Sequence, residues 1–154
     1  MSVPSWWDQL MAASDALAAV DRAQVGDWDR GNEGIREQVL RNEPDTPEEE
    51  LPEMDDLPFL VRLGGLGSAL ATSPDITDDE RIRALSVVED ALDKGDEVEQ
   101  NAIVTGFLEA MLNQRDKFDL RRLWPSLGPL TRQSCVDLEN FWTNQAPDWM
   151  TLSE

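Results

Sequence analysis

Residues 96–112, Asp-Glu-Val-Glu-Gln-Asn-Ala-Ile-Val-Thr-Gly-Phe-Leu-Glu-Ala-Met-Leu, decide the fold of this chain. Asp96 can cap the start of a helix, and Glu99, three positions later, can complete a capping box. The residues that follow, up to Leu112, are mostly apolar. We therefore predict a helix over 97–113 and place it at the centre of the molecule.

The polar residues of this helix are few and regularly spaced. From residue 101 to residue 112 only Asn101, Thr105 and Glu109 are polar, and their four-residue spacing places them on one narrow stripe. A helix that is apolar on all other sides must be enclosed by its neighbours. Phe107 and Met111 are therefore expected to be almost fully buried.

A second helix precedes the central one. Thr77 and Glu80 form another capping box, and Gly95 can end a helix over 78–94. Because the link between 78–94 and 97–113 is short, the two helices are expected to be antiparallel neighbours. Such a hairpin resembles one HEAT-type unit, although no second copy with the same spacing is present to indicate a solenoid.

The N-terminal third predicts interrupted helices. Apolar residues at three- and four-residue spacing predict a helix over 4–23, with one of Trp6 and Trp7 facing the core and the other its rim. The glycines between 26 and 34 are expected to break the pattern. A short helix is then predicted from Ile35 until just before Pro44.

Further helices complete the pattern. A helix over 57–72 is expected to be capped by Asp56, to bury Leu60 with its other apolar residues, and to make a close contact or kink at its glycines. The last helix is predicted over 130–142, with Phe141 among its apolar positions, and a tail over 143–154 follows. No strand pattern appears. We predict one all-α domain over 1–154, a compact helical bundle with the HEAT-like antiparallel hairpin at its centre.

Charge is the strongest global signal. The 154 residues hold 32 acidic and 13 basic side chains, a formal net charge of −19. No base lies between Arg41 and Arg62, between Lys94 and Arg115, or after Arg132. Such a field repels nucleic acid and anionic membranes and attracts basic partners. The alternative is that acidity only keeps the protein soluble or suits a salty cytoplasm.

The most acidic stretch is 43–56, with eight acids, three prolines and no base. We predict a loop with one helical turn started by Thr46 and Pro47. It is either a solvated connector or a flexible acidic strip that lies along a basic cleft of a partner. The small basic patch at Arg115, Lys117, Arg121 and Arg122 is expected to pair with acidic neighbours inside the fold.

Several kinds of chemistry are disfavoured. The absence of histidine excludes histidine-based catalysis and histidine metal ligands, and the single cysteine, Cys135, argues against a thiol enzyme or a structural zinc site. No calcium-loop spacing or convincing phosphate loop is present. We expect no enzyme activity, no cofactor and no metal. With no membrane span, no secretory signal and a lone cysteine, the expected location is the cytoplasm.

One segment resembles a known class of proteins. Residues 87–113 are similar to a recurrent segment of small acidic all-α immunity proteins of bacterial polymorphic toxin–immunity systems, in which a turn with two acids leads to x-Asn-x-Ile/Val-x-x-x-Phe-Leu-Glu-x-Leu. The matching residues are Asp96, Glu97, Val98, Asn101, Ile103, Phe107, Leu108 and Glu109. The resemblance covers less than a quarter of the chain. It implies that this chain is an immunity partner, which neutralises a cognate toxin by binding it.

Charge and resemblance together favour an immunity protein that occludes a basic toxin domain through an acidic surface. The acids expected to bind it come from the loop and from the ends of the hairpin, with two tryptophans as apolar anchors beside them: Glu48, Glu49, Glu50, Asp55, Asp56, Asp93, Asp96, Glu97, Trp28 and Trp149. The alternative is a non-catalytic helical adaptor or structural subunit with incidental acidity. A nucleic-acid mimic would share the same electrostatics.

Overall fold

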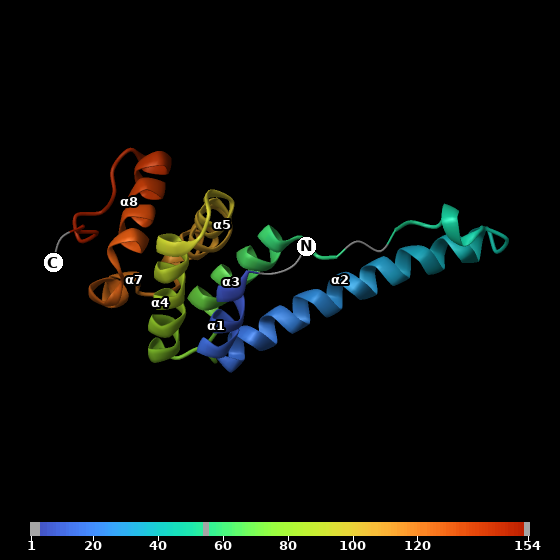
Figure 1. Ribbon diagram of the computed structural model, residues 1–154, viewed down its shortest axis with the longest axis horizontal. Helices are drawn as coiled ribbons and strands as arrows, with labels where there is room; N and C mark the ends of the chain where they lie inside the picture. The colour runs from blue at the N-terminus through green and yellow to red at the C-terminus, as the bar shows by residue number, and fades with distance from the viewer. Residues whose placement is uncertain (1–3, 54–55, 153–154) are drawn as a thin grey trace.

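The computed structural model describes residues 4–53 and 56–152 and is all-helical, with no strand in these two ranges. Figure 1 shows a body of packed helices from which one long helix, α2, projects. This confirms the predicted all-α class. In the part of the chain that the structure describes, no helix combines the length and apolarity needed to cross a bilayer.

The central helix forms where the sequence predicts it. It runs through α5 (Glu97–Ala102), a π-helical segment (Ile103–Leu108) and α6 (Glu109–Asn113). The predicted capping box is present, because the backbone N–H of Glu99 donates to Asp96 over 2.8 Å and that of Asp96 donates to Glu99 over 2.9 Å. The π-helical geometry was not predicted. Phe107 and Met111 are both 0% exposed, as expected.

Helix α3 (Phe59–Thr72) crosses the central helix at very short range. A Cβ atom on Gly67 would lie 2.1 Å from the carbonyl oxygen of Phe107. In the other direction, a Cβ on Gly106 would lie 3.1 Å from the Cβ of Leu63. The predicted close helix contact is therefore real, and Gly67 and Gly106 make it possible because they carry no side chain.

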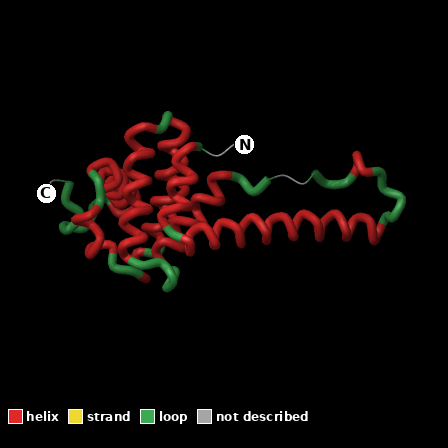
Figure 2. Tube along the Cα trace, turned by 60° about the horizontal axis from the view of Figure 1, so that its bottom comes forward, coloured by secondary structure: helices red, strands yellow, loops and turns green. Residues whose placement is uncertain are grey.

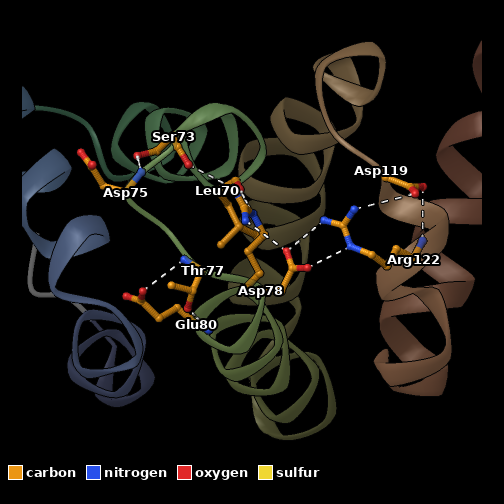
Figure 3. Close-up of polar contacts among 9 residues, drawn as sticks. Leu70, Ser73, Asp75, Thr77, Asp78, Glu80, Asp119 and Arg122 are labelled. Atoms are coloured by element: carbon orange, nitrogen blue, oxygen red, sulfur yellow. Dashed lines mark hydrogen bonds and ion pairs between the residues drawn. The ribbon is translucent and has the colours of Figure 1, made fainter.

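Helix α4 (Asp78–Lys94) begins at the predicted Thr77–Glu80 capping box (Figure 3). Gly95 follows it as its C-cap. Arg81, in its first turn, donates to the carbonyl oxygens of Leu70 and Ser73 over 2.7 and 3.0 Å. Arg81 thereby satisfies carbonyls at the C-terminal end of α3, which no intrahelical donor reaches. The likeness of the α4–α5 hairpin to a HEAT unit stays a prediction.

The N-terminal third differs from the prediction. The helix expected over 4–23 is two helices, α1 (Ser5–Ala13) and α2 (Asp15–Asn42), which meet at Ser14. Ser14 has extended backbone angles and accepts a hydrogen bond from the N–H of Leu17 over 3.2 Å, so it caps α2. The first helix therefore ends within a sequence pattern that looked continuous.

The expected glycine break between 26 and 34 is wrong, because α2 continues through these residues. The whole helix is 28 residues long. The projecting part of α2 is visible in both Figure 1 and Figure 2. Each glycine costs up to about 1 kcal/mol relative to alanine, which a helix tied down by other contacts can absorb. Such contacts are present: Arg30 pairs with Asp27, and Arg36 pairs with Glu48 and donates to the carbonyl oxygen of Pro52 over 2.8 Å.

The acidic loop follows α2. Its described part contains a single 3₁₀ turn, Glu48–Glu50, which confirms the predicted turn after Thr46 and Pro47. Leu51 is buried, whereas the three glutamates are exposed. The chain then returns to the body, where α3 begins after Pro58.

The C-terminal part folds as short turns and one long helix. After η3 (Arg115–Lys117) come α7 (Leu120–Leu123), η4 (Trp124–Ser126) and α8 (Pro129–Thr143). Glu89 of α4 accepts from the backbone N–H groups of Leu130 and Thr131 over 3.2 and 2.8 Å. Because these N–H groups lie in the first turn of α8, Glu89 caps that helix from a distant part of the chain.

Several side chains depart from their predicted positions. Trp6 and Trp7 are both buried, so neither lies at a rim, and their rings pack with that of Phe59. Asp56 does not cap α3, whose N-cap is Pro58 without a side-chain hydrogen bond. Leu60 and Phe141, expected to be buried, are 49% and 83% exposed. Leu60 reaches the central helix at Gly106 but stays partly open to solvent.

Candidate acidic docking groove

A groove of about 1120 Å³ lies on the body beside the base of α2. Its walls come from α2, from the segment that leads into α3, from the first turns of α3, and from α5 with the first turn of the π-helical segment. The lining residues are Pro4, Val25, Asp29, Asp56, Leu57, Pro58, Phe59, Leu60, Arg62, Asp96, Val98, Glu99, Asn101, Ala102 and Thr105.

The groove joins acids that are distant in the sequence. Asp56 comes from the first stretch without bases, Asp96 and Glu99 come from the second, and Asp29 is contributed by α2. The two stretches were expected to make a single negative field if they shared one face. They do share this groove, but only through Asp56, Asp96 and Glu99.

Among the described residues that line the groove there is one base, and it is already paired. Arg62 donates to both carboxylate oxygens of Asp21, over 3.0 Å from Nε and 2.6 Å from Nη2, and its guanidinium lies 4.7 Å from the ring centre of Trp7. The hydrogen bond with Asp21 raises the pKa of Arg62, while partial burial acts in the opposite direction. The bidentate pair commits the hydrogen-bond donors of Arg62 to Asp21, and Asp56 is the groove acid whose charge also acts on Arg62.

Apolar side chains are exposed beside these acids. Leu60 on α3 is 49% exposed and Val98 on α5 is 69% exposed. Single exposed apolar residues are ordinary on protein surfaces. Here, however, two of them line the same groove as four carboxylates, and an apolar centre with a polar rim is the usual composition of a protein interface.

Other bases are also used inside the fold. Arg115 pairs with the buried Glu139 over 3.2 Å, and Arg122 pairs with Asp78 over 2.9 Å (Figure 3). The hydrogen bond from Arg122 lowers the pKa of Asp78. The predicted internal pairing of the basic patch is thus confirmed for Arg115 and Arg122. Because these bases pair elsewhere, no salt bridge within the described residues involves Asp29, Asp56, Asp96 or Glu99 of the groove.

The other predicted site residues are spread out. The turn Glu48–Glu50 lies at the distal end of α2, far from the α4–α5 turn that carries Asp93, Asp96 and Glu97 (Figure 1). Asp93 and Glu97 are exposed but do not line the groove. Asp55 lies outside the described residues. One continuous acidic face that includes all these acids is therefore not formed.

The two tryptophans predicted as anchors differ. Trp28 lies on α2 and is 37% exposed. Trp149 packs edge-on against Trp124, with ring centres 5.6 Å apart, and lines a smaller cavity of about 290 Å³ at the C-terminal end. Its ring is thus docked on the core of its own chain, so it supplies little free surface. Leu60 and Val98, which the sequence analysis did not single out as anchors, are better placed beside the groove acids.

The single cysteine is buried in the core. Cys135 is 0% exposed, and desolvation, with a smaller effect of Glu139, raises the pKa of its thiol to about 12. A reactive cysteine needs an accessible thiolate. In the two described ranges, no three histidine, cysteine or acidic side chains are grouped closely enough to hold a metal ion.

Cys135 should therefore resist modification in the native protein. With a thiol-reactive chromogenic disulfide at mildly alkaline pH, we expect negligible labelling over minutes and complete labelling after addition of denaturant, because only unfolding exposes the thiol. Absorbance of the released thiolate measures both reactions. Rapid stoichiometric labelling of the native chain would contradict the buried position.

Comparison with known proteins adds one match. Residues 70–143 are similar to a family described as a domain of unknown function, DUF7674. No curated protein and no solved structure matches the chain. The matched residues include α4 to α8, and hence the α5 wall of the groove. They do not include α2, the segment that leads into α3 or the first turns of α3, which contribute the other walls of the groove.

Proposed function

We propose that this chain is a non-catalytic binding protein that neutralises a cognate bacterial toxin by covering a basic surface of the toxin domain. The observation that carries the proposal is the groove in which Asp56, Asp96 and Glu99, from two stretches without bases, meet the exposed side chains of Leu60 and Val98. Charge of this kind speeds and directs association, and the apolar residues supply contact area. The similarity of residues 87–113 to a segment of immunity proteins supports the proposal that the partner is a toxin domain.

Growth of cells tests this function directly. Cells that express the toxin domain encoded beside this chain should stop growing, and co-expression of the chain should restore growth. The two proteins should also purify together at low salt. If the chain neither protects the cells nor co-purifies with the toxin domain, the immunity function is refuted.

The acidic loop provides a sharper, quantitative prediction. Exchange of Glu48, Glu49, Glu50, Asp55 and Asp56 for serine should slow association with the toxin domain by about tenfold or more at low salt and flatten its salt dependence. Stopped-flow fluorescence at several salt concentrations measures both effects. The melting temperature should stay nearly unchanged, because the glutamates of the turn are exposed and exposed ion pairs such as Arg36–Glu48 contribute at most about 1 kcal/mol.

A control variant separates steering from net charge. It replaces five exposed acids elsewhere with serine and so changes the net charge equally: Asp75, Asp90, Asp116, Asp137 and Asp148. If the loop acids steer the partner, the control should bind faster than the loop variant at the same salt. Equal association rates for the two variants would show that only total charge matters and that the loop has no special part.

A helical adaptor is the second candidate, and the projecting helix α2 favours it. An adaptor would hold two partners together, one at the body and one along α2. Truncation of residues 30–53 to a short Gly-Ser link, which keeps Asp29 in the groove wall, distinguishes the candidates. An adaptor would lose one partner and keep the other, whereas an inhibitor that binds through the groove would keep protection of the cell, with slower association.

A further inference from the structure

The groove walls offer an occupant side chains and a few isolated backbone donors. Leu60 and Val98 are the second residues of α3 and α5, where first-turn N–H groups have no partner within the helix. No strand is present in residues 4–53 and 56–152, so no sheet edge is available there to pair with an extended peptide. An extended occupant would therefore leave most of its own backbone groups without partners in the groove, which is costly.

An occupant that satisfies its own backbone hydrogen bonds is a helix. A helix with side chains is about 10 Å wide, and a cylinder of that width and 1120 Å³ is about 14 Å long, or roughly nine to ten residues. By volume, the groove matches two to three helical turns. Partner helices that lie in such grooves use apolar residues three and four positions apart on one face.

The charges of the groove determine which helix fits. Carboxylates face it from α2 through Asp29, from the segment before α3 through Asp56, and from α5 through Asp96 and Glu99. Arg62, the one base among the described lining residues, is held by Asp21. A helix with lysine or arginine on both sides of an apolar stripe would pair with these acids while its stripe covers Leu60 and Val98.

We propose that this groove binds a basic amphipathic helix of two to three turns, presented by the partner. That the partner is a toxin domain rests on the proposed function. The preference of the groove for a basic amphipathic helix does not depend on that function. A second copy of this chain is a poor occupant, because each copy carries a net charge of −19. Like charges of this size oppose association unless the buried contact is extensive.

Model peptides test the proposal without the natural partner. We would measure binding to the full chain by calorimetry, using an amphipathic helix of leucine and lysine about 14 residues long, enough to fill the groove with a frayed turn to spare. A scrambled peptide of the same composition and a second peptide with a central proline, which cannot stay helical, serve as controls. The helical peptide should bind at least about tenfold more tightly than either control at low salt, and amide shifts in nuclear magnetic resonance should cluster at Asn101, Ala102 and Thr105.

Variants of the chain locate the site. Leu60→Ser with Val98→Ser should weaken binding of the helical peptide by about tenfold or more, because it removes the apolar floor. Asp56→Asn with Asp96→Asn should weaken it several-fold and reduce the salt dependence, while the asparagine introduced by the second change can still cap α5. Matched controls are Phe141→Ser, at the most exposed aromatic, and Asp90→Asn, on the exposed face of α4. Both controls should bind as the unaltered chain does.

Several outcomes overturn the proposal. Equal binding of the proline peptide would assign the groove to an extended segment, and equal binding of the scrambled peptide would show charge attraction alone. Dimerisation in sedimentation experiments that the Leu60→Ser, Val98→Ser variant abolishes would assign the groove to a second copy. If peptides bind at the groove but the chain does not protect toxin-expressing cells, the immunity function is refuted and this inference stands. If the groove variants protect cells as well as the unaltered chain does, the immunity function stands and this inference is refuted.

Discussion

Phe107→Ala is expected to lower the free energy of unfolding by about 3–5 kcal/mol, the range for large-to-small changes at well-packed aromatic sites. Phe107 is 0% exposed and lies in the π-helical segment, enclosed by the hydrophobic core. The site cannot collapse easily, because the backbone of Phe107 is in close contact with α3 at Gly67. A cavity that stays open carries the larger part of this cost.

Denaturant unfolding followed by circular dichroism measures the change, with Val98→Ala as the control on the same helix. Val98 is 69% exposed, so its truncation should change stability by no more than about 0.5 kcal/mol. If Phe107→Ala costs as little as Val98→Ala, the aromatic ring is not part of a packed core and the central position of this helix is wrong.

Local signals explain which elements the sequence predicts well. The capping boxes at Thr77–Glu80 and Asp96–Glu99 each involve residues three apart, so their hydrogen bonds are encoded within a single turn. The starts of α4 and α5 were therefore predicted to the residue. The burial of Phe107 also follows from the apolar surroundings of the central helix.

Elements held by distant contacts were predicted poorly. Glycine content alone indicated a break in α2, and it does not contain the contacts that Arg36 of this helix makes with Glu48 and Pro52 across the acidic loop. The cap that Glu89 gives to α8 joins residues about forty positions apart. No local pattern contains this information.

The candidate site was likewise predicted only in part from the sequence. Charge counting identified the two stretches without bases and hence Asp56 and Asp96, which the fold brings to one groove. It could not show that Glu48 to Glu50 lie at the distal end of α2, or that Asp29 completes the groove. The apolar residues beside the acids were missed because Leu60 was assigned to the core. An exposed leucine is recognised only when the packing of its helix is known.

The contact between α3 and the central helix leads to the second large effect. Gly67→Ala is expected to destabilise the protein by about 1–3 kcal/mol, although alanine is the better helix former by up to about 1 kcal/mol. The added Cβ would lie 2.1 Å from the carbonyl oxygen and 2.9 Å from the carbonyl carbon of Phe107, and real Cβ atoms do not approach other atoms this closely. Because the opposing atoms belong to the backbone, no side-chain rotation relieves the overlap, and the two helices must move apart.

The same substitution at Gly31 in α2 is the matched control. Apart from the two neighbouring residues and the backbone of α2 itself, no described atom lies within 4 Å of a Cβ built there, and the residue is exposed. Gly31→Ala should therefore stabilise the protein by up to about 1 kcal/mol through helix propensity alone. Thermal and denaturant unfolding of both variants should give shifts of opposite sign. If Gly67→Ala is as harmless as Gly31→Ala, α3 does not cross the central helix at backbone contact, and the groove walls that this crossing positions would need a different arrangement.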